Sequence, residues 1–183
     1  KVGMGLDLYQ KTALGKQYFD RANEIMGVDI QNIIFNGPEN TLKQTQYTQP
    51  AIYIVSVIIG ELLMENGVQP SCAAGHSLGE FSALVSAGAL KFSDAVRLVH
   101  LRGKFMQEAV PVGRGSMAAI IGLPVDTIQE LCDKVSSDSK IVQPANLNSP
   151  VQTVIAGHKE AVETVSKDAL TAGAKKAVVL PVS

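Results

Sequence analysis

The sequence lacks an excess of charge of either sign. Its 183 residues carry 16 lysines and arginines against 17 aspartates and glutamates, and no basic run is longer than Lys175-Lys176. Proteins that bind nucleic acid or an anionic membrane surface usually show a basic patch or stripe. We therefore expect neither nucleic acid nor a membrane among the partners of this chain.

Cysteine is equally scarce. Cys72 and Cys132 lie far apart, without the paired spacing of a metal site. Free cysteines are most often small buried apolar residues, so we interpret both as reduced core thiols of a cytoplasmic protein. None of the three histidines has a second histidine four residues on, which argues against the H-E-x-x-H pattern of a zinc hydrolase.

Long hydrophobic runs are also missing. The longest, 51–64, is interrupted by Tyr53, Ser56, Gly60 and Glu61, and a membrane-spanning helix needs about 20 apolar residues. This run therefore predicts a buried helix. A chain of this length can hold one large domain or two small ones.

The ends of the chain carry their own signal. It begins at Lys1 without a signal-peptide pattern and stops at Ser183, directly after the strand-like run 177–182. Domains seldom end in this way. We expect the chain to be a segment of a longer protein.

The first part, 1–114, has helical spacing of apolar residues over 16–26, 51–65, 78–87 and 93–109. Pro50 is expected to open the second of these helices, and Ser93 to cap the last. The small apolar residues before Gly75 are expected to form a strand. We assign 1–114 to a core domain.

The second part, 115–183, alternates short β-rich runs with helices. Strands are expected at 117–121, 141–147, 153–156 and 176–182, and helices at 124–135 and 159–172. The order β-α-β-β-α-β is typical of a ferredoxin-like subdomain, in which two helices cover one face of an antiparallel sheet. The predicted fold class is α/β.

Residues 75–79, Gly75-His76-Ser77-Leu78-Gly79, form a G-x-S-x-G motif. Such a motif can place a serine on a sharp strand-to-helix turn, where its hydroxyl becomes an exposed nucleophile. The unpaired Leu78 amide would then face the negative charge that develops on an attacked carbonyl. A turn that merely needs two glycines gives the same pattern.

Several separated motifs together closely resemble the malonyl-CoA:acyl carrier protein transacylase family, whose acyltransferase fold is shared with polyketide synthases. They include Gln46-Tyr47-Thr48-Gln49-Pro50-Ala51, the elbow through Phe81, Arg102-Gly103-Lys104-Phe105-Met106-Gln107, and Asn146-Leu147-Asn148-Ser149-Pro150. The resemblance spans nearly the whole chain. It implies an α/β-hydrolase-like core, built on a parallel sheet with the nucleophile elbow, plus a ferredoxin-like subdomain.

The resemblance also implies a reaction. Ser77 would attack malonyl-CoA, hold malonate as an ester, and pass it to the phosphopantetheine thiol of an acyl carrier protein for fatty-acid synthesis. Members of this family need no metal or redox cofactor. We expect a cytoplasmic monomer whose partners are malonyl-CoA as substrate and acyl carrier protein.

Site residues follow from the same resemblance. Arg102 matches the family's substrate arginine, whose planar guanidinium suits the free carboxylate of malonate. Met106, one turn further on, is expected to line the acyl pocket or to belong to the core. Gln49 matches a family glutamine near the active site, or caps the helix. Asn146 and Asn148 match cleft-facing residues, or form an ordinary turn.

Two catalytic parts of the family lie outside this sequence, namely the base histidine beyond Ser183 and a second oxyanion amide ahead of Val2. We expect the segment alone to be a poor catalyst. His76, His100 and His158 are interpreted as structural residues, the first in the elbow and the last at the surface or as a helix cap. Val151 replaces a glycine common in the family, which leaves the shape of its loop open.

Three other functions compete. A generic serine esterase would use Ser77 equally well, and a non-catalytic module could bind carrier protein or CoA without turnover. Within the family, an extender-unit acyltransferase of a polyketide synthase is the nearest alternative. Arg102 and the second subdomain favour a transferase, since it must protect its ester from water.

Overall fold

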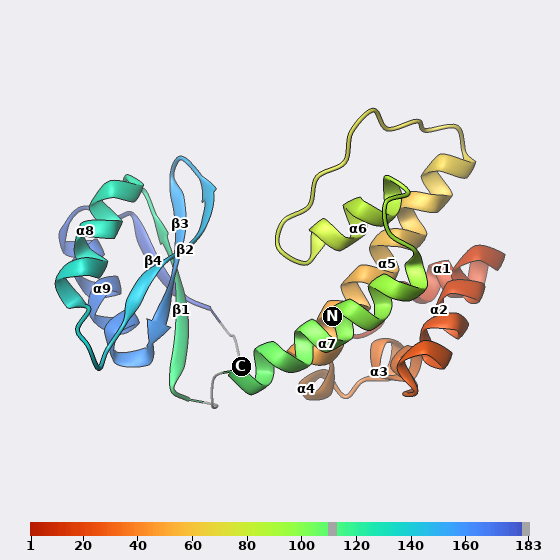
Figure 1. Cartoon of the computed structure of the whole chain (residues 1–183), viewed down its shortest axis with the longest axis horizontal. Helices are drawn as coiled ribbons and strands as arrows, with labels where there is room; N and C mark the ends of the chain where they lie inside the picture. Colours follow the sequence, from red (N-terminus) through yellow and green to blue (C-terminus); the bar gives the residue numbers. More distant parts are fainter. Residues whose placement is uncertain (110–112, 181–183) are drawn as a thin grey trace. The chain divides into compact units, whose positions relative to one another are not determined.

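The computed structural model describes residues 1–109 and 113–180. The chain divides into two compact units, Lys1–Ala109 and Val110–Ser183 (Figure 1). The boundary between them along the chain falls at 109/110, a few residues before the one that the sequence suggested at 114/115. Each unit has its own hydrophobic core.

The described part of the first unit is helical. Its elements are α1 (Leu6–Lys11), α2 (Ala13–Met26), α3 (Ile30–Asn36), α4 (Glu39–Leu42), α5 (Thr45–Glu65), α6 (Gly79–Ser86) and α7 (Phe92–Ala109). Local chemistry sets several of their ends. Thr12 accepts the Gly15 amide at the start of α2, and Gly27, with φ 65°, ends that helix in a left-handed conformation.

The core of this unit forms where α5 packs against α7 and α2. Figure 1 shows α5 and α7 side by side along much of their length. Tyr53 of α5 is buried and stacks on Phe92 with ring centroids 5.5 Å apart. Its hydroxyl donates to the Phe92 carbonyl at 3.2 Å, and burial raises the pKa of Tyr53. These contacts tie the start of α7 to the middle of α5.

Two helix starts differ from the prediction. Helix α5 begins at Thr45, so Pro50 lies inside it and does not open it. Helix α7 begins at Phe92, and the amides of Asp94 and Ala95 donate to the Lys91 carbonyl, so Ser93 is not the N-cap. An interior proline removes one backbone hydrogen bond. The burial of Gln49, Pro50 and the following turns against neighbouring helices evidently outweighs that loss.

The strand predicted ahead of the elbow is absent from the described residues of the first unit, and so is the parallel sheet. Residues 68–77 form no helix or strand and are all exposed. A strand needs a neighbouring strand to pair its backbone amides and carbonyls, and every regular element of this unit is helical. Cys72, in this segment, is exposed, so its assignment to the core is wrong, whereas Cys132 is buried.

Helix α5 alone among the described helices is long and apolar enough to cross a membrane, judged by length and composition. A core helix passes the same test. One face of α5, carrying Tyr53, Ile54, Val57 and Ile58, is fully or almost fully buried in the first unit. The predicted burial therefore holds for this face alone, since Ile52, Ile59 and Leu63 of the same helix are exposed.

The second unit has the expected β-α-β-β-α-β order. Its elements are β1 (Gly115–Ile121), α8 (Val125–Val135), β2 (Val142–Ser149), β3 (Gln152–His158), α9 (Lys159–Thr171) and β4 (Lys176–Val179). The strands pair antiparallel in the order β2-β3-β1-β4. Helices α8 and α9 lie on one side of this sheet (Figure 1), which is the ferredoxin-like arrangement.

The turn that contains Val151 is a tight hairpin. Ser149 pairs with Gln152, which leaves Pro150 and Val151 as the connecting residues. The Val151 amide donates to the Ser149 hydroxyl at 3.3 Å, and its carbonyl accepts from the Gly122 amide at 2.8 Å. Val151 has no positive φ, so this turn does not require a glycine.

Candidate active site

Ser77 occupies a strained turn. Among residues 1–109 and 113–180 it is the one non-glycine with a positive φ, at 52°, a conformation that L-residues rarely adopt. A Cβ on Gly75 would overlap the backbone of Gly79 and Glu80, whereas a Cβ on Gly79 would meet nothing within 4 Å. The sharp bend therefore depends on Gly75. It leaves Ser77 exposed at the entrance of α6.

The amides after Ser77 show how the turn continues into α6. Those of Gly79, Glu80 and Phe81 donate to the carbonyls of residues 76, 77 and 78 at 2.9, 3.3 and 3.1 Å. Within the described residues the Leu78 amide has no such acceptor. The Leu78 side chain is buried in the core of the unit. Its anchored backbone leaves one N–H available beside the Ser77 hydroxyl, as an oxyanion donor requires.

Arg102 connects the elbow to two helices. Its Nη2 donates to Ser77 Oγ at 3.0 Å, and its Nη1 donates to Gln49 Oε1. Gln49 is 7% exposed and donates through Nε2 to the Met106 sulfur at 3.2 Å. Four residues singled out from the sequence thus meet in one network contributed by α5, the elbow and α7.

This network places a fixed positive charge beside the Ser77 hydroxyl. Arg102 forms no ion pair with a carboxylate in the described part of the chain, so both prongs of its guanidinium reach neutral oxygens. An incoming carboxylate is a stronger acceptor than a hydroxyl or an amide. An arginine cannot take the proton of Ser77, so the general base has to be another group.

An apolar groove adjoins Arg102. It has a volume of about 530 Å³ and is lined by Phe81, Leu98, Leu101, Arg102, Phe105, Met106 and Ala109. Met106 is 49% exposed, so it lines this groove and is not a core residue. The groove combines apolar walls with a single cation, which suits an acyl chain that ends in an acid.

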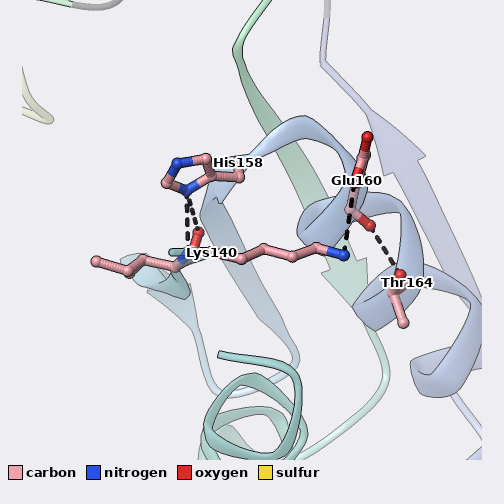
Figure 2. Close-up of polar contacts among 5 residues, drawn as sticks. Lys140, His158, Glu160 and Thr164 are labelled. Carbon is pink, nitrogen blue, oxygen red and sulfur yellow. Dashed lines mark hydrogen bonds and ion pairs between the residues drawn. The ribbon is translucent and has the colours of Figure 1, made fainter. Parts of the chain in front are cut away.

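The three histidines occupy separate places. His76 is exposed, and its carbonyl accepts from the Gly79 amide. His100 lies with its Nδ1 3.2 Å from the Gln46 carbonyl. His158 stands at the N-cap position of α9 without a capping bond from its side chain. Figure 2 shows its ring beside the Lys140 turn, where Nδ1 accepts from the Ile141 amide at 3.0 Å.

Asn146 and Asn148 belong to the second unit. Both lie in β2, where Asn146 is opposite Val154 next to a register shift. Asn148 is exposed and donates to Gln152 Oε1 at 3.3 Å. The hairpin explains their local structure, and their role toward a substrate stays a prediction.

The contact of His100 with the Gln46 carbonyl was not predicted from the sequence, although the sequence contains a signal for it. A proline inside a helix leaves the carbonyl four residues earlier without its normal donor. Once α5 extends back to Thr45, that carbonyl belongs to Gln46. A neighbouring polar side chain could then have been expected to bond it.

A serine on a strained turn beside a free backbone amide is typical of serine acyl-transfer enzymes, and here an arginine lies beside it as well. The family model described as acyl transferase domain matches residues 1–182. The chain belongs to this acyl transferase family, and the resemblance drawn from its motifs is confirmed.

Curated relatives agree along the whole chain. It is 46% identical over 182 residues to the malonyl CoA-acyl carrier protein transacylase of Bacillus subtilis, covering 100% of this chain and 57% of that protein. It is 48% identical over 183 residues to the protein of the same name from Escherichia coli, again covering 100% of this chain and 59% of the relative. The chain thus spans less than two thirds of these relatives.

Solved structures agree as well. The malonyl CoA-acyl carrier protein transacylase from Coxiella burnetii matches with a TM-score of 0.95 and 46% identity, over 100% of this chain and 58% of that one. A malonyl-transacylase in complex with its type II PKS acyl-carrier protein matches with a TM-score of 0.94 and 48% identity, over 100% and 59%.

Proposed function

We propose that this chain is part of a malonyl-CoA:acyl carrier protein transacylase that supplies malonyl groups for fatty-acid synthesis. The observation that carries the proposal is the 3.0 Å contact between Arg102 Nη2 and Ser77 Oγ. It sets a carboxylate-binding group within one hydrogen bond of the candidate nucleophile. Only an acyl group with a second, free acid would use both.

The reaction has two half-steps. Ser77 Oγ attacks the thioester carbonyl of malonyl-CoA, its proton passes to a base, and the C–S bond breaks to release the CoA thiol. The thiol of the carrier protein's phosphopantetheine then attacks the malonyl ester and restores the Ser77 hydroxyl. The Leu78 amide stabilises the oxyanion in both half-steps. We expect the base to be a histidine outside residues 1–183.

Gln49 and Met106 support substrate binding. Gln49 accepts from Nη1 of Arg102 and so limits the rotation of the guanidinium. Met106 presents its sulfur to Gln49 and a polarizable surface to the apolar groove. We propose that the enzyme acts in the cytoplasm as a monomer without a metal or redox cofactor, with acyl carrier protein as its partner.

An extender-unit acyltransferase of polyketide synthesis is the second candidate. The match to a malonyl-transacylase solved with its type II PKS acyl-carrier protein supports transfer to a carrier protein, which is the first candidate, and does not favour this alternative over it. The two candidates share the Ser77 and Arg102 chemistry and differ in the carrier protein they load. A generic esterase has no use for Arg102 at the nucleophile.

The test is intact-mass spectrometry of the full-length protein after brief exposure to malonyl-CoA. We expect a malonyl adduct that disappears in Ser77→Ala and moves to added carrier protein. An acetyl-CoA arm measures selectivity. No adduct, or an adduct that only water removes, would contradict the proposal.

A further inference from the structure

Helix α5 carries a backbone defect close to the candidate site. In an α-helix the amide of each residue donates to the carbonyl four residues earlier. Pro50 lies inside α5 and has no amide hydrogen, so the Gln46 carbonyl loses its regular donor. An unpaired carbonyl at a helix–helix contact is costly.

His100 of α7 fills this gap. Its Nδ1 lies 3.2 Å from the Gln46 carbonyl oxygen in a partly buried contact. A carbonyl can only accept, so the bond requires the hydrogen on Nδ1. The donor that Pro50 lacks is therefore supplied by a side chain of the neighbouring helix.

The same turn of α7 approaches the backbone of α5 closely. A Cβ on Gly103 would lie 2.7 Å from both Gln46 Cα and the Thr45 carbonyl oxygen. The helices can touch here because residue 103 has no side chain. The bond from His100 and the contact at Gly103 together fix where this turn of α7 lies along α5.

Arg102 comes from that turn. It stands between His100 and Gly103 and reaches Gln49, one turn of α5 beyond Gln46. Two hydrogen bonds therefore join the same pair of turns, from His100 to Gln46 and from Arg102 to Gln49. A shift of α7 along α5 would move the guanidinium away from Ser77 Oγ.

We propose that His100 is a positioning residue for malonyl recognition, which acts by replacing the hydrogen bond that Pro50 removes from α5 and so holds Arg102 beside Ser77. The inference rests on the proposed function, since it assigns Arg102 the substrate carboxylate. It predicts an effect on the choice between malonyl and acetyl groups, and not merely on stability.

The first experiment compares three substitutions in the full-length protein. In His100→Asn the amide nitrogen takes nearly the place of Nδ1, in His100→Gln it lies one bond too far, and His100→Ala has no donor. We expect Asn to keep the selectivity of kcat/KM for malonyl-CoA over acetyl-CoA, and Gln and Ala to lower it about fivefold, the size expected from one lost neutral hydrogen bond. Equal selectivity in all three variants would overturn the proposal.

The second experiment restores the missing amide. In Pro50→Ala the amide of residue 50 can donate to the Gln46 carbonyl, so His100→Ala should shift the thermal unfolding midpoint less in this background than in the wild type. Additive shifts would overturn the proposed contact. This readout needs no activity, so it separates failure of the inference from failure of the proposed function, which the absence of a malonyl adduct on Ser77 would show.

Discussion

At the scale of single residues, the candidate site depends on one crowded glycine and one strained serine. Gly75 lies against the backbone of Gly79 and Glu80, and Ser77 holds a positive φ. Strain of this kind costs about 1–3 kcal/mol and persists only where the surroundings enforce it. The enforcing element is the bend at Gly75.

The two glycines of the motif should therefore respond differently to alanine. We expect Gly75→Ala to lower the free energy of unfolding by about 3 kcal/mol or to prevent folding, because its methyl group overlaps backbone that cannot move aside. Gly79→Ala, the matched control, should be neutral or slightly stabilising, since its Cβ meets open space and alanine favours a helix. Chemical denaturation measures both variants, and equal losses would contradict this account.

Much of the site at this scale could be predicted from the sequence. The motifs singled out Ser77, Leu78, Arg102, Gln49 and Met106, and four of them meet in one network. The bond from His100 to Gln46 could not be predicted, because it depends on how closely α5 and α7 approach. That distance is set by packing at Gly103 and not by any local pattern.

At the scale of elements, the helices and the sheet of the second unit could be predicted from periodicity, whereas the first residues of α5 and α7 could not. Pro50 was expected at the first turn of α5 and lies five residues after Thr45, because tertiary packing outweighed the one lost hydrogen bond. The strand ahead of the elbow did not form, since strand formation depends on partners that the pattern of one segment does not contain. The apolar residues around Cys72 were not enough to bury it, and its side chain is exposed.

The two cysteines differ in burial, since Cys72 is exposed and Cys132 is buried. Burial in α8 raises the pKa of Cys132 to about 11, so at pH 8 only about one thiol in a thousand would be ionised. We expect iodoacetamide to modify the exposed Cys72 in the folded chain. Cys132 should react at least about a hundredfold more slowly until the chain is unfolded. Peptide mass mapping with and without denaturant tests this, and equal rates in the native state would refute it.

The same pKa has a consequence for stability. A raised pKa means that the folded state keeps the thiol proton longer than the unfolded chain does. The contribution of Cys132 to the free energy of unfolding is therefore complete below about pH 9 and is lost as the pH rises toward about 11. In a Cys132→Ser variant, this part of the loss in the free energy of unfolding at alkaline pH should be absent.

At the scale of the whole molecule, the chain combines two units of different secondary structure. The second unit holds a whole ferredoxin-like sheet, and its β-α-β-β-α-β order was readable because each element has its own periodicity. The first unit presents helices and an elbow without a parallel sheet in its described residues. The chain spans 57% and 59% of two curated relatives.

The central claim is that Arg102 binds the free carboxylate of the malonyl group beside Ser77, and substitution of Arg102 tests this claim most directly. In the full-length protein we expect Arg102→Ala to reduce kcat/KM for malonyl-CoA by the equivalent of about 2 to 5 kcal/mol and to leave acetyl-CoA nearly unchanged. Arg97→Ala is the control, because Arg97 lies exposed on the same helix and pairs only loosely with Asp94, at 4.0 Å. An equal loss for malonyl-CoA and acetyl-CoA would contradict the account.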